Sequence, residues 1–178
     1  MNFSEIVLEY LQPLFVRYDL KIVEQGTNYL KLICDTLVIG ISYNKFERSN
    51  TLWIGDTNSR EYPIEIDNQV LKEVFNSDLE LSQIPTETFI KNLLTFFDTE
   101  GRPLIMGDKK IIHDLEQFDA ERSRKYTHDL IQKQNLQEAD KAWSENNYKD
   151  FIRIMDQTSK VGLPASYEMK YKIARKKI

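Results

Sequence analysis

The sequence predicts an α+β protein: an N-terminal helix, an antiparallel β-meander of three to five strands, and a largely helical C-terminal half. Over residues 20–66, apolar and polar residues alternate and β-branched and aromatic side chains dominate, as in half-buried strands. On both sides of this segment apolar residues recur every three or four positions, as on one face of a helix. Because no strand–helix–strand pattern occurs, a doubly wound parallel sheet is not expected.

The first helix is expected over residues 2–15. Its apolar residues have helical spacing, and Asn2 or Ser4 can cap its start. Pro13 is expected to end or bend the helix because proline lacks an amide hydrogen. The residues of the apolar face are Phe3, Ile6, Val7, Tyr10, Leu11 and Leu14.

Turn-forming residues at 25–28, 35–36 and 48–50 divide the next segment into strands. Alternate residues of a strand share one face, and the short turns favour strands that pair in chain order. The apolar faces are expected to consist of Leu30, Leu32 and Cys34, then Leu37, Ile39, Ile41 and Tyr43, and then Tyr62, Ile64 and Ile66, with Glu61 and Glu65 on the opposite side.

After residue 67 the spacing of apolar residues is helical again. Helices are expected near residues 70–75 and 86–97, and a long one from about 109 to 133. A helix pair joined at residues 146–147 and a final helix after Pro164 complete the chain. We expect one compact protein over residues 1–178, with a division into an acidic α/β part (1–103) and a helical part (104–178) as the alternative.

The composition fits a folded chain without disulfides or membrane spans. Hydrophobic residues make up 41% of the 178 residues, and Cys34 is the only cysteine. No run reaches the roughly 18–20 apolar residues that cross a bilayer, and Glu5 and Glu9 interrupt the first segment where a signal peptide would be apolar. These features predict a cytoplasmic protein that does not bind membranes.

The charge is divided unequally along the chain. Residues 1–100 carry 8 basic and 16 acidic side chains, whereas residues 101–178 carry 16 basic and 12 acidic ones. An acidic surface attracts basic partners and repels the phosphates of nucleic acids. A nucleic-acid role would have to rest on the C-terminal half alone, and a nucleic-acid partner is not expected.

The sequence holds no catalytic or cofactor motif. Its two histidines, His113 and His128, are 15 residues apart and remote from Cys34 in sequence, which gives no spacing typical of metal ligands. The six glycines form no phosphate-binding pattern, and no serine has glycine neighbours typical of a nucleophile. We expect no cofactor, no metal and no enzymatic activity; an enzyme that uses surface carboxylates is the remaining catalytic alternative.

Three runs in the first half carry a resemblance: residues 29–35 (YLKLICD), 37–43 (LVIGISY) and 48–55 (RSNTLWIG). Residues 139–143 (ADKAW), 147–151 (NYKDF) and 163–176 add to it near the C-terminus. Together they resemble small bacterial immunity-type proteins of polymorphic toxin systems. The resemblance implies an N-terminal helix, a central hairpin and closing helices. It also implies a protein partner, the cognate toxin domain, which is inhibited by occlusion without catalysis.

No catalytic residue follows from this resemblance, so the interface is predicted on physical grounds. Acidic side chains near the sheet edge would steer a basic toxin, and aromatic side chains would anchor it. Tyr43 and Trp53 are the expected anchors, with core packing of both as the alternative. The predicted interface residues are Tyr43, Glu47, Trp53, Asp56, Glu61 and Glu65.

A second hypothesis comes from the C-terminal half. Ala139, Ala142 and Trp143, followed by Asn147 and Tyr148, also resemble one tetratricopeptide-like helix pair. Such a pair would belong to an adaptor that binds a peptide or protein. It ranks second because a stable solenoid needs about three repeats.

Overall fold

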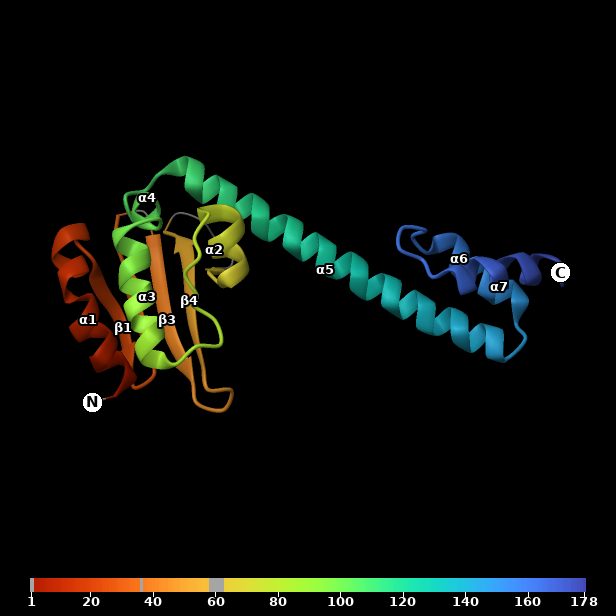
Figure 1. Cartoon of the computed structure of the whole chain (residues 1–178), viewed down its shortest axis with the longest axis horizontal. Coiled ribbons are helices and arrows are strands. Elements are labelled where there is room, and N and C mark those ends of the chain that lie inside the picture. Colours follow the sequence, from red (N-terminus) through yellow and green to blue (C-terminus); the bar gives the residue numbers. More distant parts are fainter. Residues whose placement is uncertain (1, 36, 58–62) are drawn as a thin grey trace. The chain divides into compact units, whose positions relative to one another are not determined.

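The computed structural model of this chain describes residues 2–35, 37–57 and 63–178, and Figure 1 shows their helices and strands. The predicted α+β class is confirmed: an N-terminal helix, a five-stranded antiparallel sheet and a mostly helical C-terminal half. The chain forms two compact units, unit 1 (Met1–Asp119) and unit 2 (Ala120–Ile178). The predicted boundary at residues 103 and 104 falls inside unit 1.

Helix α1 (Phe3–Tyr18) begins with a reciprocal cap. The amide of Glu5 donates to the side chain of Asn2 at 3.0 Å, and the amide of Asn2 donates to the carboxylate of Glu5 at 2.8 Å. The helix does not end at Pro13. Pro13 lies on the exposed side of the helix, where water can satisfy the carbonyl group that the proline leaves without a donor. The left-handed residue Asp19 (φ 47°) ends α1 instead.

Five strands form one antiparallel sheet in chain order, as the short turns predicted. Strand β1 is an edge strand with a bulge between Ile22 and Glu24, and β5 at the other edge is only two residues long. The strands are β1 (Lys21–Gly26), β2 (Tyr29–Ile33), β3 (Leu37–Asn44), β4 (Ser49–Asp56) and β5 (Ile64–Glu65).

The remaining helices of unit 1 are α2 (Asn68–Phe75), α3 (Thr86–Asp98), α4 (Arg102–Ile105) and the beginning of α5 (Lys109–Ser144). Helix α4 is not among the helices expected from the sequence. Pro103 occupies the second position of α4, where an amide hydrogen has no partner within the helix.

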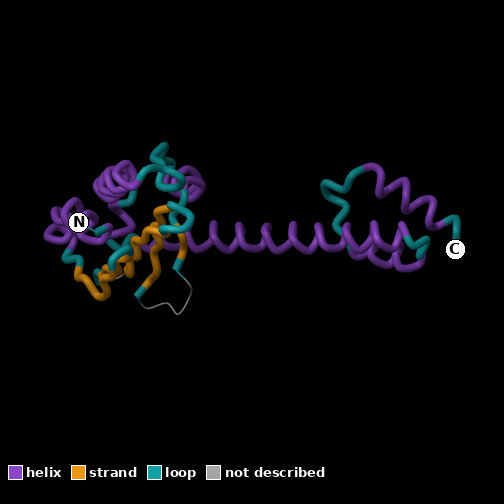
Figure 2. Tube along the Cα trace, turned by 90° about the horizontal axis from the view of Figure 1, so that it is seen from below, coloured by secondary structure: helices purple, strands orange, loops and turns teal. Residues whose placement is uncertain are grey.

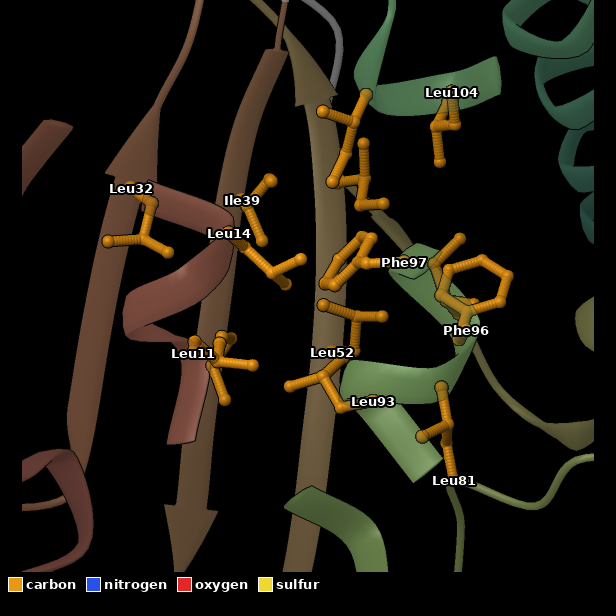
Figure 3. Packing of buried hydrophobic residues seen from close by; sticks show 14 of the residues in the cluster. Leu11, Leu14, Leu32, Ile39, Leu52, Leu81, Leu93, Phe96, Phe97 and Leu104 are labelled. Atoms are coloured by element: carbon orange, nitrogen blue, oxygen red, sulfur yellow. The ribbon is translucent and has the colours of Figure 1, made fainter. Parts of the chain in front are cut away.

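The core of unit 1 lies between one face of the sheet and the helices. In Figure 2, α1, α2 and α3 gather on one side of the strands. Figure 3 shows Leu11 and Leu14 of α1 and Phe97 of α3 directed at the strand residues Ile39 and Leu52. All of these side chains are at most 1% exposed. Fully burying one such side chain contributes about 1.5–3 kcal/mol, so this contact is the main stabilising feature of unit 1.

A buried asparagine joins the sheet to α3. Asn50, on the covered face of β4, is 6% exposed, and its amide donates to the carbonyl oxygen of Ile84 at 3.2 Å. Its side-chain oxygen accepts a hydrogen bond from the hydroxyl of Thr86, the first residue of α3, at 3.2 Å. Both ends of the buried amide are therefore satisfied, which avoids the cost of an unpaired polar group.

Unit 2 contains α5 from residue 120 onwards, together with α6 (Tyr148–Gln157) and α7 (Ala165–Arg175). Trp143 of α5 packs on Tyr148 and Phe151 of α6, with ring centroids 5.6 and 5.2 Å apart. Asn146 (φ 56°) and Gly162 (φ 72°) supply the left-handed residues of the two connections. The long helix runs to Ser144 rather than to about residue 133, because nothing between residues 133 and 144 breaks it.

Two tyrosine–aspartate hydrogen bonds attach α7 to its neighbours. The Tyr167 hydroxyl donates to Asp140 of α5, and the Tyr171 hydroxyl donates to Asp156 of α6, both at 2.6 Å. Partial burial, reinforced by the bond to Asp140, raises the pKa of Tyr167 to about 12. Burial opposes ionisation of Asp140, yet hydrogen bonds from Lys170 and Tyr167 lower the pKa of its carboxyl group.

Replacing Leu11 by alanine should lower the free energy of unfolding of unit 1 by about 2–5 kcal/mol, because it leaves a cavity against the sheet. Val16 lies on the same helix but is 87% exposed, so Val16→Ala should change stability by less than about 0.5 kcal/mol. Urea unfolding followed by circular dichroism measures both. Equal effects of the two substitutions would contradict the described packing of α1.

Tyr167→Phe should destabilise unit 2 by about 1 kcal/mol, because it removes the bond to Asp140. The raised pKa of Tyr167 means that its contribution is complete below pH 10 and is lost as the pH rises towards 12. The lowered pKa of Asp140 means that its contribution is lost as the pH falls through the folded-state value. The stability difference between wild type and variant, measured by thermal melting, should therefore shrink at both extremes of pH. A difference that does not vary with pH would contradict the assignment.

Candidate protein-binding surface

The sheet of unit 1 has one face that no described helix covers. Leu30 of β2, Ile39 of β3 and Leu52 of β4 point into the core. The residues next to the core-facing ones along each strand therefore point to the other side of the sheet. We call this side the open face; Figure 2 shows the strands with the helices on the opposite side. It is formed by Tyr29, Lys31, Ile33, Val38, Gly40, Ser42, Thr51, Trp53, Gly55 and Glu65.

An aromatic pair lies at the centre of the open face. Trp53 of β4 stacks with Tyr29 of β2 across the intervening strand β3, with ring centroids 6.2 Å apart and ring planes 19° apart. The indole ring lies directly over Gly40 of β3, and a methyl group at that position would overlap it. Gly40 therefore provides the space in which Trp53 lies flat on the sheet.

Charged and aliphatic side chains surround this aromatic pair. Glu24 of β1 is aligned with Lys31 of β2, and Glu65 of β5 is aligned with Trp53. Partial burial and the negative charge of Glu24 raise the pKa of Tyr29. The aliphatic residues Ile33 and Val38 are also aligned, on β2 and β3. An apolar, aromatic centre with charges around it is typical of a protein interface.

The structure brings together two of the six predicted interface residues, Trp53 and Glu65. Tyr43 lies on the helix-covered face, half-buried, where its ring stacks on Phe3 at 5.8 Å. Glu47 is exposed in the turn between β3 and β4 and accepts a hydrogen bond from Asn44 at 3.0 Å. Asp56 is half-buried at the other end of β4, and Glu61 lies outside the described residues.

Sequence reasoning missed Tyr29, Lys31 and Gly40. Its alternation pattern already separated Leu30 and Leu32 from their neighbours, so the side of Tyr29 and Lys31 could have been inferred. No sequence signal indicated which face of the sheet would lack helices. Phe46, which is 99% exposed at the tip of the turn beside Glu47, is not among the predicted interface residues.

The two units differ in charge. Unit 1 has 11 basic and 20 acidic side chains, a formal net charge of −9, and unit 2 has 13 basic and 8 acidic ones, a net charge of +5.

In the part of the chain that the structure describes, no three His, Cys, Asp or Glu side chains are placed to hold a metal ion. Among these same residues, no helix combines the length and the apolar composition that crossing a bilayer requires.

Gly40→Ala should destabilise unit 1 by about 1–3 kcal/mol and displace the Trp53 indole, because the added methyl group overlaps the ring. Gly55→Ala is the matched control on the same face, since a methyl group there meets only Pro63 at an ordinary 3.7 Å. Trp53 fluorescence, measured in a Trp143→Phe background, should shift with the first substitution alone. An unchanged spectrum for Gly40→Ala would show that the indole does not lie on Gly40.

Comparison of the chain with models of known protein families, with curated proteins and with solved structures finds no match to any of them.

Proposed function

We propose that this chain is a non-enzymatic protein-binding protein and that its open face is the contact surface. The stacked pair of Trp53 and Tyr29 is the observation that carries the proposal. Both rings are partly exposed, and neither belongs to the core cluster of unit 1. Large aromatic side chains that a partner can cover are the residues that most often dominate binding energy.

The sheet holds the aromatic pair in a fixed position, which suits a contact surface. Trp53 is held flat by Gly40 beneath it and by Tyr29 beside it, so little side-chain freedom remains to be lost on binding. The three strands that carry these residues, β2, β3 and β4, are internal strands of the sheet, so each is hydrogen-bonded to a neighbouring strand on both sides. A preorganised surface of this kind binds without a costly rearrangement.

The partner that we propose is the catalytic domain of a cognate bacterial toxin, so that the chain acts as an immunity protein in the cytoplasm. The resemblance of residues 29–55 and of the C-terminal helices to immunity-type proteins supports this proposal. The net charge of −9 on unit 1 also supports it, because a basic toxin domain would be attracted to such a surface. Inhibition would follow from covering the toxin's active site.

Co-expression tests this proposal directly. The C-terminal domain of a large secreted protein encoded beside this chain should stop bacterial growth when it is expressed alone. Growth should return when the chain is co-expressed. Continued killing at a high level of the folded chain would contradict the immunity proposal.

Substitutions on the open face test the surface separately. Trp53→Ala should weaken binding to the toxin domain by about 2 kcal/mol, or roughly 30-fold, because it removes the central ring. Glu65→Lys should slow association with a basic partner, and the effect should shrink at high salt. Val16→Ala, on the exposed side of α1, is the control and should leave binding unchanged. Surface plasmon resonance measures the rates. Wild-type affinity of Trp53→Ala would exclude the open face as the contact surface, even if growth rescue succeeds.

A further inference from the structure

Unit 2 contains a groove of its own. It runs between residues 125–140 of α5 on one side and the connection before α7, with the first turn of α7, on the other. Leu136 and Tyr167, both partly buried, form an apolar part of its lining. Lys125 lies near one end of the groove along α5 and Asp140 near the other.

The connection that forms one wall is held in place. The side-chain amide of Gln132 on α5 donates to the carbonyl oxygen of Val161 at 3.3 Å, and the amide of Val161 donates to the hydroxyl of Ser159 at 3.3 Å. Gly162 follows with φ 72°, a conformation that favours glycine. The Val161 side chain is nevertheless 83% exposed, so an apolar group stands at the groove with nothing covering it.

Two lysines and two aspartates line the groove, and they differ in their partners. Asp140 accepts hydrogen bonds from Tyr167 and Lys170, at 2.6 and 2.8 Å, and Asp129 lies 3.4 Å from the ring of His128. By contrast, Lys125 and Lys133 make no ion pair with any of the residues that the structure describes. Asp129 is 64% exposed and lies four positions from each lysine on α5. Both lysines are available to an anionic ligand.

We propose that this groove binds an extended acidic segment of another protein. Lys125 and Lys133 would each pair with a carboxylate of that segment, and Val161 would contact an apolar side chain between the two acids. The net charge of +5 on unit 2 attracts such a segment from a distance. This binding site is independent of the open face, which lies in unit 1.

The spacing of the lysines defines the ligand. Lys133 lies eight positions after Lys125, which corresponds to about 12 Å along α5. An extended chain advances about 3.3 Å per residue, so two carboxylates four positions apart match this distance. Residues at even spacing in an extended segment point the same way, so a residue midway between the acids faces the groove too.

A fluorescein-labelled seven-residue peptide tests the proposal, with glutamate at its second and sixth positions, leucine at its fourth, and serine elsewhere. Fluorescence anisotropy with the full chain should show saturable binding. Lys125→Glu combined with Lys133→Glu should raise the Kd about tenfold or more. Val161→Ser should also weaken binding, whereas Met169→Ser should not, because Met169 is 60% exposed on α7 and does not line the groove.

Two controls separate this site from general attraction between charges. Lys149→Glu combined with Lys176→Glu changes the net charge equally but alters exposed lysines outside the groove, and it should leave the Kd within about twofold. A peptide with adjacent glutamates and the same composition should bind more weakly. Absence of binding, equal losses with both double variants, or self-association of the chain through these lysines without peptide binding would each overturn the proposal. None of these outcomes depends on whether a toxin binds unit 1.

Discussion

The packing of one sheet face against α1 and α3 is the constraint on which the rest of unit 1 depends. Leu11, Leu14 and Phe97 cover this face of the sheet. Because the strand residues beneath them are buried, the alternate residues of β2, β3 and β4 point away from the core. A slip of one residue in the register of β3 would exchange the two faces and place Ile39 and Ile41 on the outside. Core packing therefore fixes the position of every residue of the open face.

The open face carries side chains that a purely solvated face does not need. A tryptophan laid flat over a glycine covers the backbone of β3 and stacks with a tyrosine two strands away. This arrangement shields part of the face, which lets large aromatic rings stand on a sheet without a helix layer over them. It also leaves each ring with an accessible side, and this combination of rigidity and accessibility underlies the proposed function.

Unit 2 is held together by different means. Its cluster is small, and α7 contributes one fully buried residue, Ala174, with the partly buried rings of Tyr167 and Tyr171. The hydrogen bonds of these tyrosines to Asp140 and Asp156 therefore matter more for the attachment of α7 than a single bond would in a large core. The bond to Asp140 also lies in the groove wall, where Lys125 and Lys133 make no ion pair with any residue that the structure describes.

The sequence by itself determined the elements of this protein, because they depend on local patterns. Alternation of apolar residues gave the strands and their pairing in chain order, and spacing by three and four gave the helices, including the turn at residues 146–147. Local patterns gave wrong predictions at two prolines, where the surrounding structure matters: Pro13 is tolerated on the exposed side of α1, and Pro103 lies in the first turn of α4.

Tertiary structure alone decided the candidate site. Which sheet face the helices cover depends on packing between residues far apart in the chain, such as Leu14 and Ile39 in one core, and no local pattern encodes this packing. For the same reason Tyr43 lies under the helices and stacks on Phe3, while Tyr29 and Trp53 meet across β3.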